Sequence, residues 1–353
     1  MDLPTVWFLA VAVLWTGYLV LEGFDFGVGM LVRAVGREEE DRETALGAIG
    51  PVWDGNEVWL IAAVGAMFAA FPAWYAATLS GLYVPVLLVL LALIVRGVGL
   101  EYRHKRDDDA WKRRWDIGIG IGSLVPAFLW GVVLANLVRG LPTVASAPGN
   151  GANTVVTASL PDLLNGYALL GGVVTTALFL LHGAVFLALK TDGPVRFRAR
   201  RIATLAVLPV LVLTVAFLIA TLALRDPSWT TPVAGASGLA LALAGFALLL
   251  HREGWAFTAT ATAVGGLSVV LFGQLHPELL VSTTDPAQTL TVANAASAPY
   301  TLTVMSWIAL VFLPLVLAYQ SWSYWVFRRR LGGGPTTPAG PATTGSPAVP
   351  SPR

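Results

Sequence analysis

Long runs of apolar residues recur along almost the whole chain, and they constrain the fold more than any other feature. A helix needs about 20 apolar residues to cross a bilayer, and only helices or closed barrels satisfy the backbone there. The sequence has no ten-residue segments of alternating hydrophobicity, which would indicate a barrel. The composition agrees, because 56% of the residues are hydrophobic and only 12% are charged. We therefore predict an all-α, polytopic integral membrane protein rather than a soluble fold.

Nine such runs are separated by charged residues or by Gly and Pro. The first run follows a start without Lys or Arg, so we expect it to remain as a helix and not to be a cleaved signal peptide. Residues 1–330 are predicted to form one transmembrane domain, and residues 331–353, rich in Gly, Pro, Ser and Thr, a disordered tail. The nine runs are about 5–32, 51–70, 78–100, 116–138, 163–189, 202–224, 232–250, 256–275 and 302–327.

The distribution of Lys and Arg predicts the direction of the chain, because basic residues accumulate on the cytoplasmic side of a membrane. Basic residues follow the first, third, fifth, seventh and ninth runs, whereas only Arg139 and Arg225 lie between the others. The N-terminus is thus predicted outside and the C-terminus in the cytoplasm. The basic residues of the cytoplasmic set are Arg33, Arg37, Arg42, Arg103, Lys105, Arg106, Lys112, Arg113, Arg114, Lys190, Arg196, Arg198, Arg200, Arg201, Arg252, Arg328, Arg329 and Arg330.

Several ionisable residues lie inside these runs, where a charge is costly and usually functional. Asp25 comes eight residues before Arg33, which places it about 12 Å inside the cytoplasmic end of the first helix. Glu22 lies one turn deeper. Asp54 and Glu57 lie near the cytoplasmic start of the second helix and share a face, since they are three residues apart.

The third predicted helix reaches the cytoplasmic side with Arg96 and then Glu101. Together with the acids of the first two helices, these residues suit a path for protons or cations from the cytoplasm. A structural explanation stays open for two of them. Asp54 follows Pro51 and is an ordinary first-turn acid, and Arg96 can extend its guanidinium to the interface.

Metal-binding patterns are weak. The chain contains no Cys and four scattered His, so no metal site is predicted and no residue is assigned to a bound cofactor. His182, within the fifth run, is more typical of a hydrogen bond to a neighbouring helix than of an iron ligand. Gly23 and Gly27 have the spacing of small residues at a close helix contact.

Four segments in the first half of the chain resemble, in order and spacing, the opening helices of subunit II of the cytochrome bd quinol oxidases. They are GFDFGVG at 23–29, WDGNEVWL at 53–60, FPAWYA at 71–76 and RGVGLEYR at 96–103. The resemblance continues at 181–193 and 302–327 and covers nearly everything before the tail.

The resemblance implies a bacterial cytoplasmic membrane complex that oxidises quinol and reduces dioxygen to water. It implies a related subunit I that ligates two b-type hemes and one d-type heme, with a small accessory subunit, quinone and lipids as further partners and no nucleic acid. The family's proton-path positions in subunit II match Asp25, Asp54, Arg96 and Glu101, and Glu57 is a further candidate.

Two other interpretations agree with part of the sequence. A secondary transporter also combines a glycine-rich helix with an intramembrane carboxylate, but nine runs do not divide into two equal repeats. A scaffold whose charges only neutralise one another is the third possibility, and the sequence leaves it open.

Overall fold

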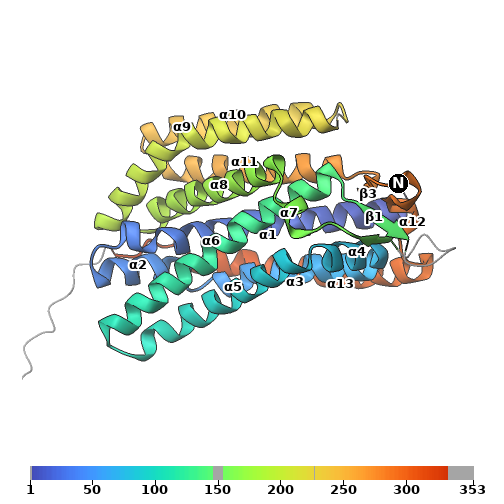
Figure 1. Ribbon diagram of the computed structural model, residues 1–353. Coiled ribbons are helices and arrows are strands. Elements are labelled where there is room, and N and C mark those ends of the chain that lie inside the picture. Colours follow the sequence, from blue (N-terminus) through green and yellow to red (C-terminus); the bar gives the residue numbers. More distant parts are fainter. Residues whose placement is uncertain (1, 146–153, 226, 333–353) are drawn as a thin grey trace, which may run out of the picture.

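The computed structural model describes residues 2–145, 154–225 and 227–332, which form an elongated bundle of helices that run roughly along one axis (Figure 1). The long helices are α1 (Leu3–Val35), α3 (Trp53–Ala70), α5 (Tyr83–Tyr102), α6 (Asp109–Arg139), α8 (Gly166–Lys190), α9 (Gly193–Leu224), α10 (Thr230–Leu249), α11 (Glu253–Gln274) and α13 (Pro299–Val326). The short helices are α2 (Glu39–Ile49), α4 (Pro72–Gly81), η1 (Arg103–Lys105), α7 (Leu160–Leu163), η2 (Pro286–Gln288) and α12 (Val292–Ala295).

Within the described ranges, eight helices are long and apolar enough to cross a membrane, and each coincides with a predicted run. The remaining run, 51–70, corresponds to α3. This helix has 18 residues but begins with Asp54, Asn56 and Glu57, and it is not among the eight. The polar start of α3 is therefore the one place where apolar length alone does not indicate a membrane crossing.

Two short helices were not predicted from the sequence, α2 between the first two runs and α4 at the start of the third. α2 is a polar helix with acids in its first turn and a buried side that includes Leu46 and Ile49. α4 begins at Pro72, directly after α3 ends, and the predicted third run started inside it at residue 78. Proline is favourable at the first position of a helix, but it cannot continue a helix that precedes it. Proline thus divides one apolar stretch into α3 and α4.

The centre of the bundle is the contact between α1 and α8. A Cβ on Gly27 would overlap the carbonyl oxygen of Phe179, and one on Gly183 would overlap the backbone of Gly27. A Cβ on Gly23 would meet the Phe179 ring. The two backbones therefore approach as closely as the small-residue spacing predicted.

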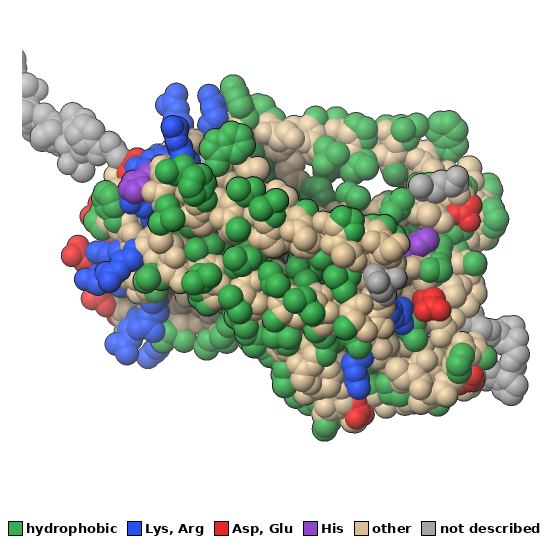
Figure 2. Space-filling model, turned by 90° about the horizontal axis from the view of Figure 1, so that it is seen from above, with side chains coloured by type: hydrophobic (Ala, Val, Ile, Leu, Met, Phe, Trp, Pro, Cys, Tyr) green, Lys and Arg blue, Asp and Glu red, His purple; other side chains and the backbone are tan. Residues whose placement is uncertain are grey.

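The two ends of the bundle differ in chemistry. The end that carries α2, called here the α2 end, holds most of the Lys and Arg side chains visible in Figure 2. The opposite end of the bundle, called here the strand end, carries two antiparallel strand pairs. They are β1 (Thr143–Ala145) with β2 (Thr154–Val156) and β3 (Glu278–Leu280) with β4 (Leu290–Thr291). Most of the surface between the ends is apolar or backbone, as expected of a membrane-facing surface.

Helix α13 lies at the periphery, and Leu302 is its only buried residue. Trp7 of α1 donates to the Leu302 carbonyl and the Ser306 hydroxyl near the strand end. At the α2 end the following segment pairs with the end of α8, because Leu331 donates to the Lys190 carbonyl at 2.9 Å. Leu331 and Gly332 are thus described and Leu331 is paired, while the rest of the predicted tail, 333–353, lies outside the described residues.

Candidate functional site

A buried ion pair connects α1 with α5. Arg96 and Glu22 are both fully buried, and Arg96 Nη1 donates to Glu22 Oε1. The guanidinium also lies over the Phe26 ring, 4.9 Å from its centroid. Arg96 Nε and Nη2 and Glu22 Oε2 have no hydrogen-bond partner among the described residues. The pair is therefore only partly satisfied, which is costly in a low-dielectric interior.

Asp25 lies one turn from Glu22 on α1 and is also fully buried. Its Oδ2 accepts a hydrogen bond of 2.7 Å from the side-chain amide of Asn56 on α3. Its Oδ1 has no hydrogen-bond partner among the described residues. Two carboxyl groups, Glu22 and Asp25, are thus buried one turn apart, and only Glu22 pairs with the buried cation Arg96.

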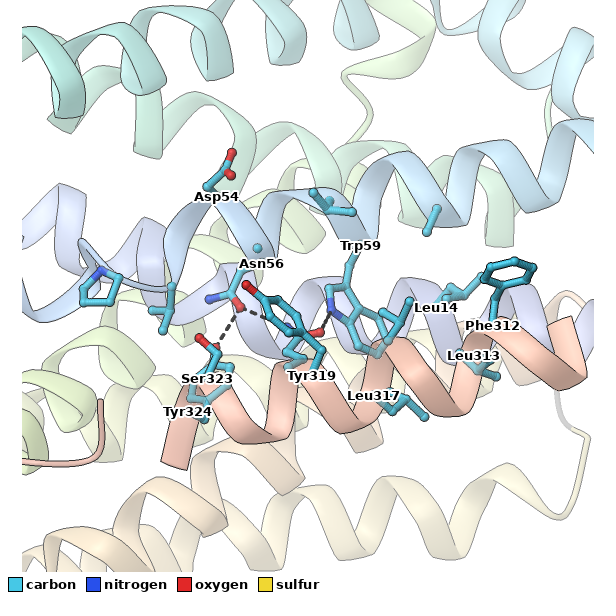
Figure 3. Close-up of a pocket in the computed structure, with 17 residues that line it drawn as sticks. Leu14, Asp54, Asn56, Trp59, Phe312, Leu313, Leu317, Tyr319, Ser323 and Tyr324 are labelled. Carbon is cyan, nitrogen blue, oxygen red and sulfur yellow. Dashed lines mark hydrogen bonds between the residues drawn. The ribbon is translucent and has the colours of Figure 1, made fainter. Parts of the chain in front are cut away.

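Asn56 links this cluster to a groove between α3 and α13 (Figure 3). The Tyr324 hydroxyl donates to Asn56 Oδ1 at 2.7 Å, and the Gln320 amide approaches the same oxygen at 3.4 Å. Trp59 in turn donates to the Gln320 oxygen at 2.7 Å. The groove has a volume of about 570 Å³, and its walls are mostly apolar. A polar chain therefore runs from buried Asp25 to the surface of the bundle.

The other predicted site residues are placed differently. Glu57 is partly exposed, and its Oε2 lies 3.9 Å from Arg96 Nη1, so it belongs to the same cluster. Asp54 and Glu101 are exposed and make no hydrogen bond or ion pair with the described residues. Figure 3 shows Asp54 pointing away from α13, on the side of α3 opposite to Asn56. The structure thus brings together Asp25, Arg96 and Glu57 but not Asp54 and Glu101.

A second charged network closes the α2 end. Arg103 is buried and pairs with Asp116 of α6 at 2.6 Å and with Glu39 of α2 at 2.9 Å. Burial alone would raise the pKa of Glu39, but the hydrogen bond from Arg42, the charge of Arg103 and the hydrogen bond from Lys112 hold it below its ordinary value. The network ties α2, which lies along the end of the bundle, to α5 and α6.

The second contact of α2 is with α9. Arg198 donates to Asp41 at 2.5 Å and to the Val35 carbonyl at 2.7 Å. Burial would raise the pKa of Asp41, and the hydrogen bond from Arg198 lowers it below its ordinary value. Sequence reasoning did not find α2 as an element, because its 11 residues lie between two apolar runs and look like a charged loop.

The histidines do not fit a heme site within this chain. His182 Nε2 lies 3.2 Å from the Val20 carbonyl and Nδ1 lies 2.7 Å from the Thr260 hydroxyl, so both ring nitrogens are engaged with neighbouring helices. The ring also stacks on Phe257. His104 and His251 are exposed at the α2 end, and His276 lies at the strand end against Phe8. The predicted hydrogen-bonding role of His182 is confirmed.

Sequence reasoning did not assign three residues of the cluster, Asn56, Gln320 and Tyr324, to the site. Asn56 and Gln320 carry no charge, and Tyr324 looks like an ordinary interfacial aromatic residue, so none of them is conspicuous. A signal was present for Asn56, since it lies between Asp54 and Glu57 in the most polar run. No comparable signal marked the two residues of α13.

Comparisons with known proteins agree with the resemblance seen in the sequence. Residues 3–327 match the family model described as cytochrome bd terminal oxidase subunit II. The chain is 42% identical to cytochrome bd ubiquinol oxidase subunit 2 of Bacillus subtilis over 335 residues, which are 94% of this chain and 97% of the relative. It is 35% identical to cytochrome bd-I ubiquinol oxidase subunit 2 of Escherichia coli K12 over 357 residues, covering 91% and 93%.

The fold has a solved counterpart. A chain of the bd oxidase from Geobacillus thermodenitrificans superposes with a TM-score of 0.73 at 18% identity, covering 92% of this chain and 99% of that one. At this identity the match supports the fold alone. The family model and the two relatives span nearly the whole chain, and the chain therefore belongs to the cytochrome bd terminal oxidase subunit II family.

Proposed function

We propose that this chain is the second subunit of a membrane-bound quinol:oxygen oxidoreductase, and that its buried cluster passes protons from the cytoplasm towards the oxygen-reducing site. The single observation that carries the proton role is that Glu22 and Asp25, one turn apart on α1, are both fully buried while Arg96 pairs only with Glu22 of the two. Two carboxylates beside one guanidinium leave one negative charge uncompensated, and a proton is the smallest species that neutralises it. A purely structural ion pair would need only one acid.

The geometry supports a defined order of transfer. Glu57 is partly exposed and lies beside Arg96, so it connects the surface with the buried acids. The free oxygens Glu22 Oε2 and Asp25 Oδ1 are the acceptor sites inside, since the other oxygen of each group is already hydrogen-bonded. We place Asp54 and Glu101 at the outer part of the path, where they attract protons by their charge.

We further propose that the partner subunit I covers the exposed side of α3. An ionised carboxylate that faces lipid is costly, and Asp54 has no partner within the described chain. Its side of α3 also exposes Val58 and Ile61. The partner then ligates the two b-type hemes and the d-type heme, binds quinol and receives the protons. A small accessory subunit and bound quinone or lipid complete the proposed assembly.

The proposed topology has nine crossings, with the N-terminus outside and the C-terminus in the cytoplasm of a bacterial inner membrane. The concentration of Lys and Arg at the α2 end supports this direction (Figure 2). The crossing by α3, which is not among the eight long apolar helices, is tested by fusing a reporter that is active only in the cytoplasm. It is expected to work after Glu43 and to fail after Leu82, whereas equal activity at both sites shows that α3 does not cross.

Co-purification tests the assignment of the hemes. Expressed alone, the chain is expected to carry no stoichiometric heme, and expressed with a subunit I it is expected to purify as a complex with b-type and d-type heme spectra. His182→Ala is the matched control, because it removes the buried imidazole and is expected to leave each heme signal in place. Stoichiometric heme on the isolated chain contradicts the proposal.

A further inference from the structure

A second cavity, with a volume of about 330 Å³, lies at the α2 end and has Tyr324 among its lining residues. Its floor is apolar and largely aromatic and comes from α8, α11 and the end of α13. The floor residues are Phe186, Leu189, Phe257 and Phe327. Its rim is basic and consists of Lys190, Arg328, Arg329 and Arg330. We call these two sets the aromatic floor and the basic rim.

The basic rim is held in place by the backbone of the segment after α13. Leu331 donates to the Lys190 carbonyl at 2.9 Å, and Asp192 donates back to the Leu331 carbonyl at 2.9 Å. The Lys190 amine donates to the carbonyls of Phe327 and Arg329. The three arginines therefore lie on a fixed loop at the end of α8, rather than on a free chain end.

Two of these arginines are uncompensated. Arg330 lies 3.3 Å from Asp192 and 3.9 Å from Glu253. Arg328 only donates to the Trp325 carbonyl and lies over the Trp325 ring, and Arg329 makes no side-chain ion pair with the described residues. None of the described residues that line the cavity is acidic. The rim thus presents unpaired positive charge beside an apolar floor.

We propose that this cavity binds one acidic phospholipid of the cytoplasmic leaflet. Its phosphate lies against Arg328 and Arg329, and part of an acyl chain covers the aromatic floor. The cytoplasmic leaflet carries the anionic lipids, and basic pockets between helices on that side suit their head groups. A free phosphate would use only the rim. The inference rests on the proposed orientation of the chain.

The position of the cavity gives the lipid a structural role. Tyr324 lines both this cavity and the groove between α3 and α13, and its hydroxyl donates to Asn56. A lipid that fills the cavity therefore packs against Tyr324 and keeps α13 against α3. In this way the bound lipid stabilises the polar chain that leads to Asp25.

Native mass spectrometry tests the proposal. The protein is purified as it assembles in its host membrane, stripped of lipid, and then mixed with phosphatidylglycerol or phosphatidylcholine. Retention of phosphatidylglycerol in preference to phosphatidylcholine is expected. The double variant Arg328→Gln, Arg329→Gln is expected to bind phosphatidylglycerol about 30-fold more weakly, since each basic residue near the surface contributes about 1 kcal/mol. Arg328→Lys with Arg329→Lys is expected to retain most of the affinity.

The matched control is Arg113→Gln with Arg114→Gln, which removes the same charge from exposed residues of the same end but away from the cavity. This control is expected to bind phosphatidylglycerol like the parent. Equal weakening in both double variants, equal retention of the two lipids, or full displacement by inorganic phosphate would each overturn the proposal. The measurement does not use oxygen consumption, so its failure is distinguishable from failure of the proposed oxidase function.

Discussion

Asp25 on α1 and Asn56 on α3 are joined by a hydrogen bond of 2.7 Å, and both side chains are fully buried. The amide donates to one carboxyl oxygen and leaves the other without a partner. Because Asn56 also accepts from Tyr324, the contact fixes the direction of the amide and with it the free oxygen of Asp25. A carboxyl group held in this way can bind and release a proton without moving.

Asp25→Asn is therefore expected to keep assembly and heme content while quinol-driven oxygen consumption falls by about 100-fold, the lower range of what a positioned proton-transfer group contributes. Asp25→Glu is expected to retain more activity, because it keeps an ionisable group. Oxygen uptake and heme spectra of membranes are to be compared across these variants. Asp109→Asn, at an exposed acid of the α2 end, is the control. Parental turnover in Asp25→Asn would mean that the acid is structural.

The buried pair of Glu22 and Arg96 predicts a strong non-additivity. Arg96→Gln alone leaves the buried Glu22 without its cation, and the loss of one partner of a buried pair costs about 3–5 kcal/mol. Glu22→Gln combined with Arg96→Gln is expected to be less destabilised than the sum of the two single variants. Thermal unfolding of the purified complex measures the three values. Simple additivity would show that the two residues do not interact.

The contact of α1 and α8 predicts a packing defect. Gly183→Ala places a methyl group against the backbone of Gly27, and overpacking of this kind costs about 1–3 kcal/mol. The variant is expected to assemble in lower yield and to unfold at a lower temperature. Gly235→Ala on α10 has no atom within 4 Å of the added Cβ and is the matched control. Equal stability of the two variants would contradict the close approach of the helices.

The attachment of α2 is expected to weaken in acid. The pKa of Glu39 is lower in the folded protein than its ordinary value of 4.5, because its three basic partners outweigh the effect of burial. The contribution of ionised Glu39 to the stability of the folded protein is thus complete above that ordinary value. It is lost as the pH falls through the depressed pKa of the folded state. Hydrogen exchange of α2, corrected for the intrinsic rate, is expected to increase as the pH falls below 4.5.

Glu39→Gln is the control for this titration. It removes the ionisable group, so the pH dependence of exchange in α2 is expected to become shallower while α8 remains protected in both proteins. An unchanged profile would assign the acid sensitivity to other groups. Asp41, whose pKa is also lowered by its contact with Arg198, is then the next residue to test.

The sequence by itself located eight of the nine predicted apolar helices, and their direction through the membrane stays a prediction. Each of eight predicted runs coincides with a long apolar helix, and the family resemblance is confirmed by relatives that span the chain. The reason is local: a helix in lipid satisfies its own backbone, so length and apolar composition predict it without reference to its neighbours. The sequence also indicated that Glu22 and Asp25 lie one turn apart on the first helix, because they are three residues apart.

Only the tertiary structure decided which of these residues meet. Arg96 pairs with Glu22, and Asp25 contacts Asn56, whereas the sequence grouped these charged residues in one path without pairing them. Asp54 faces outwards although it lies only three residues from Glu57. These outcomes depend on the rotation of each helix about its own axis, which is set by close contacts such as Gly27 with Gly183, formed between segments more than 150 residues apart.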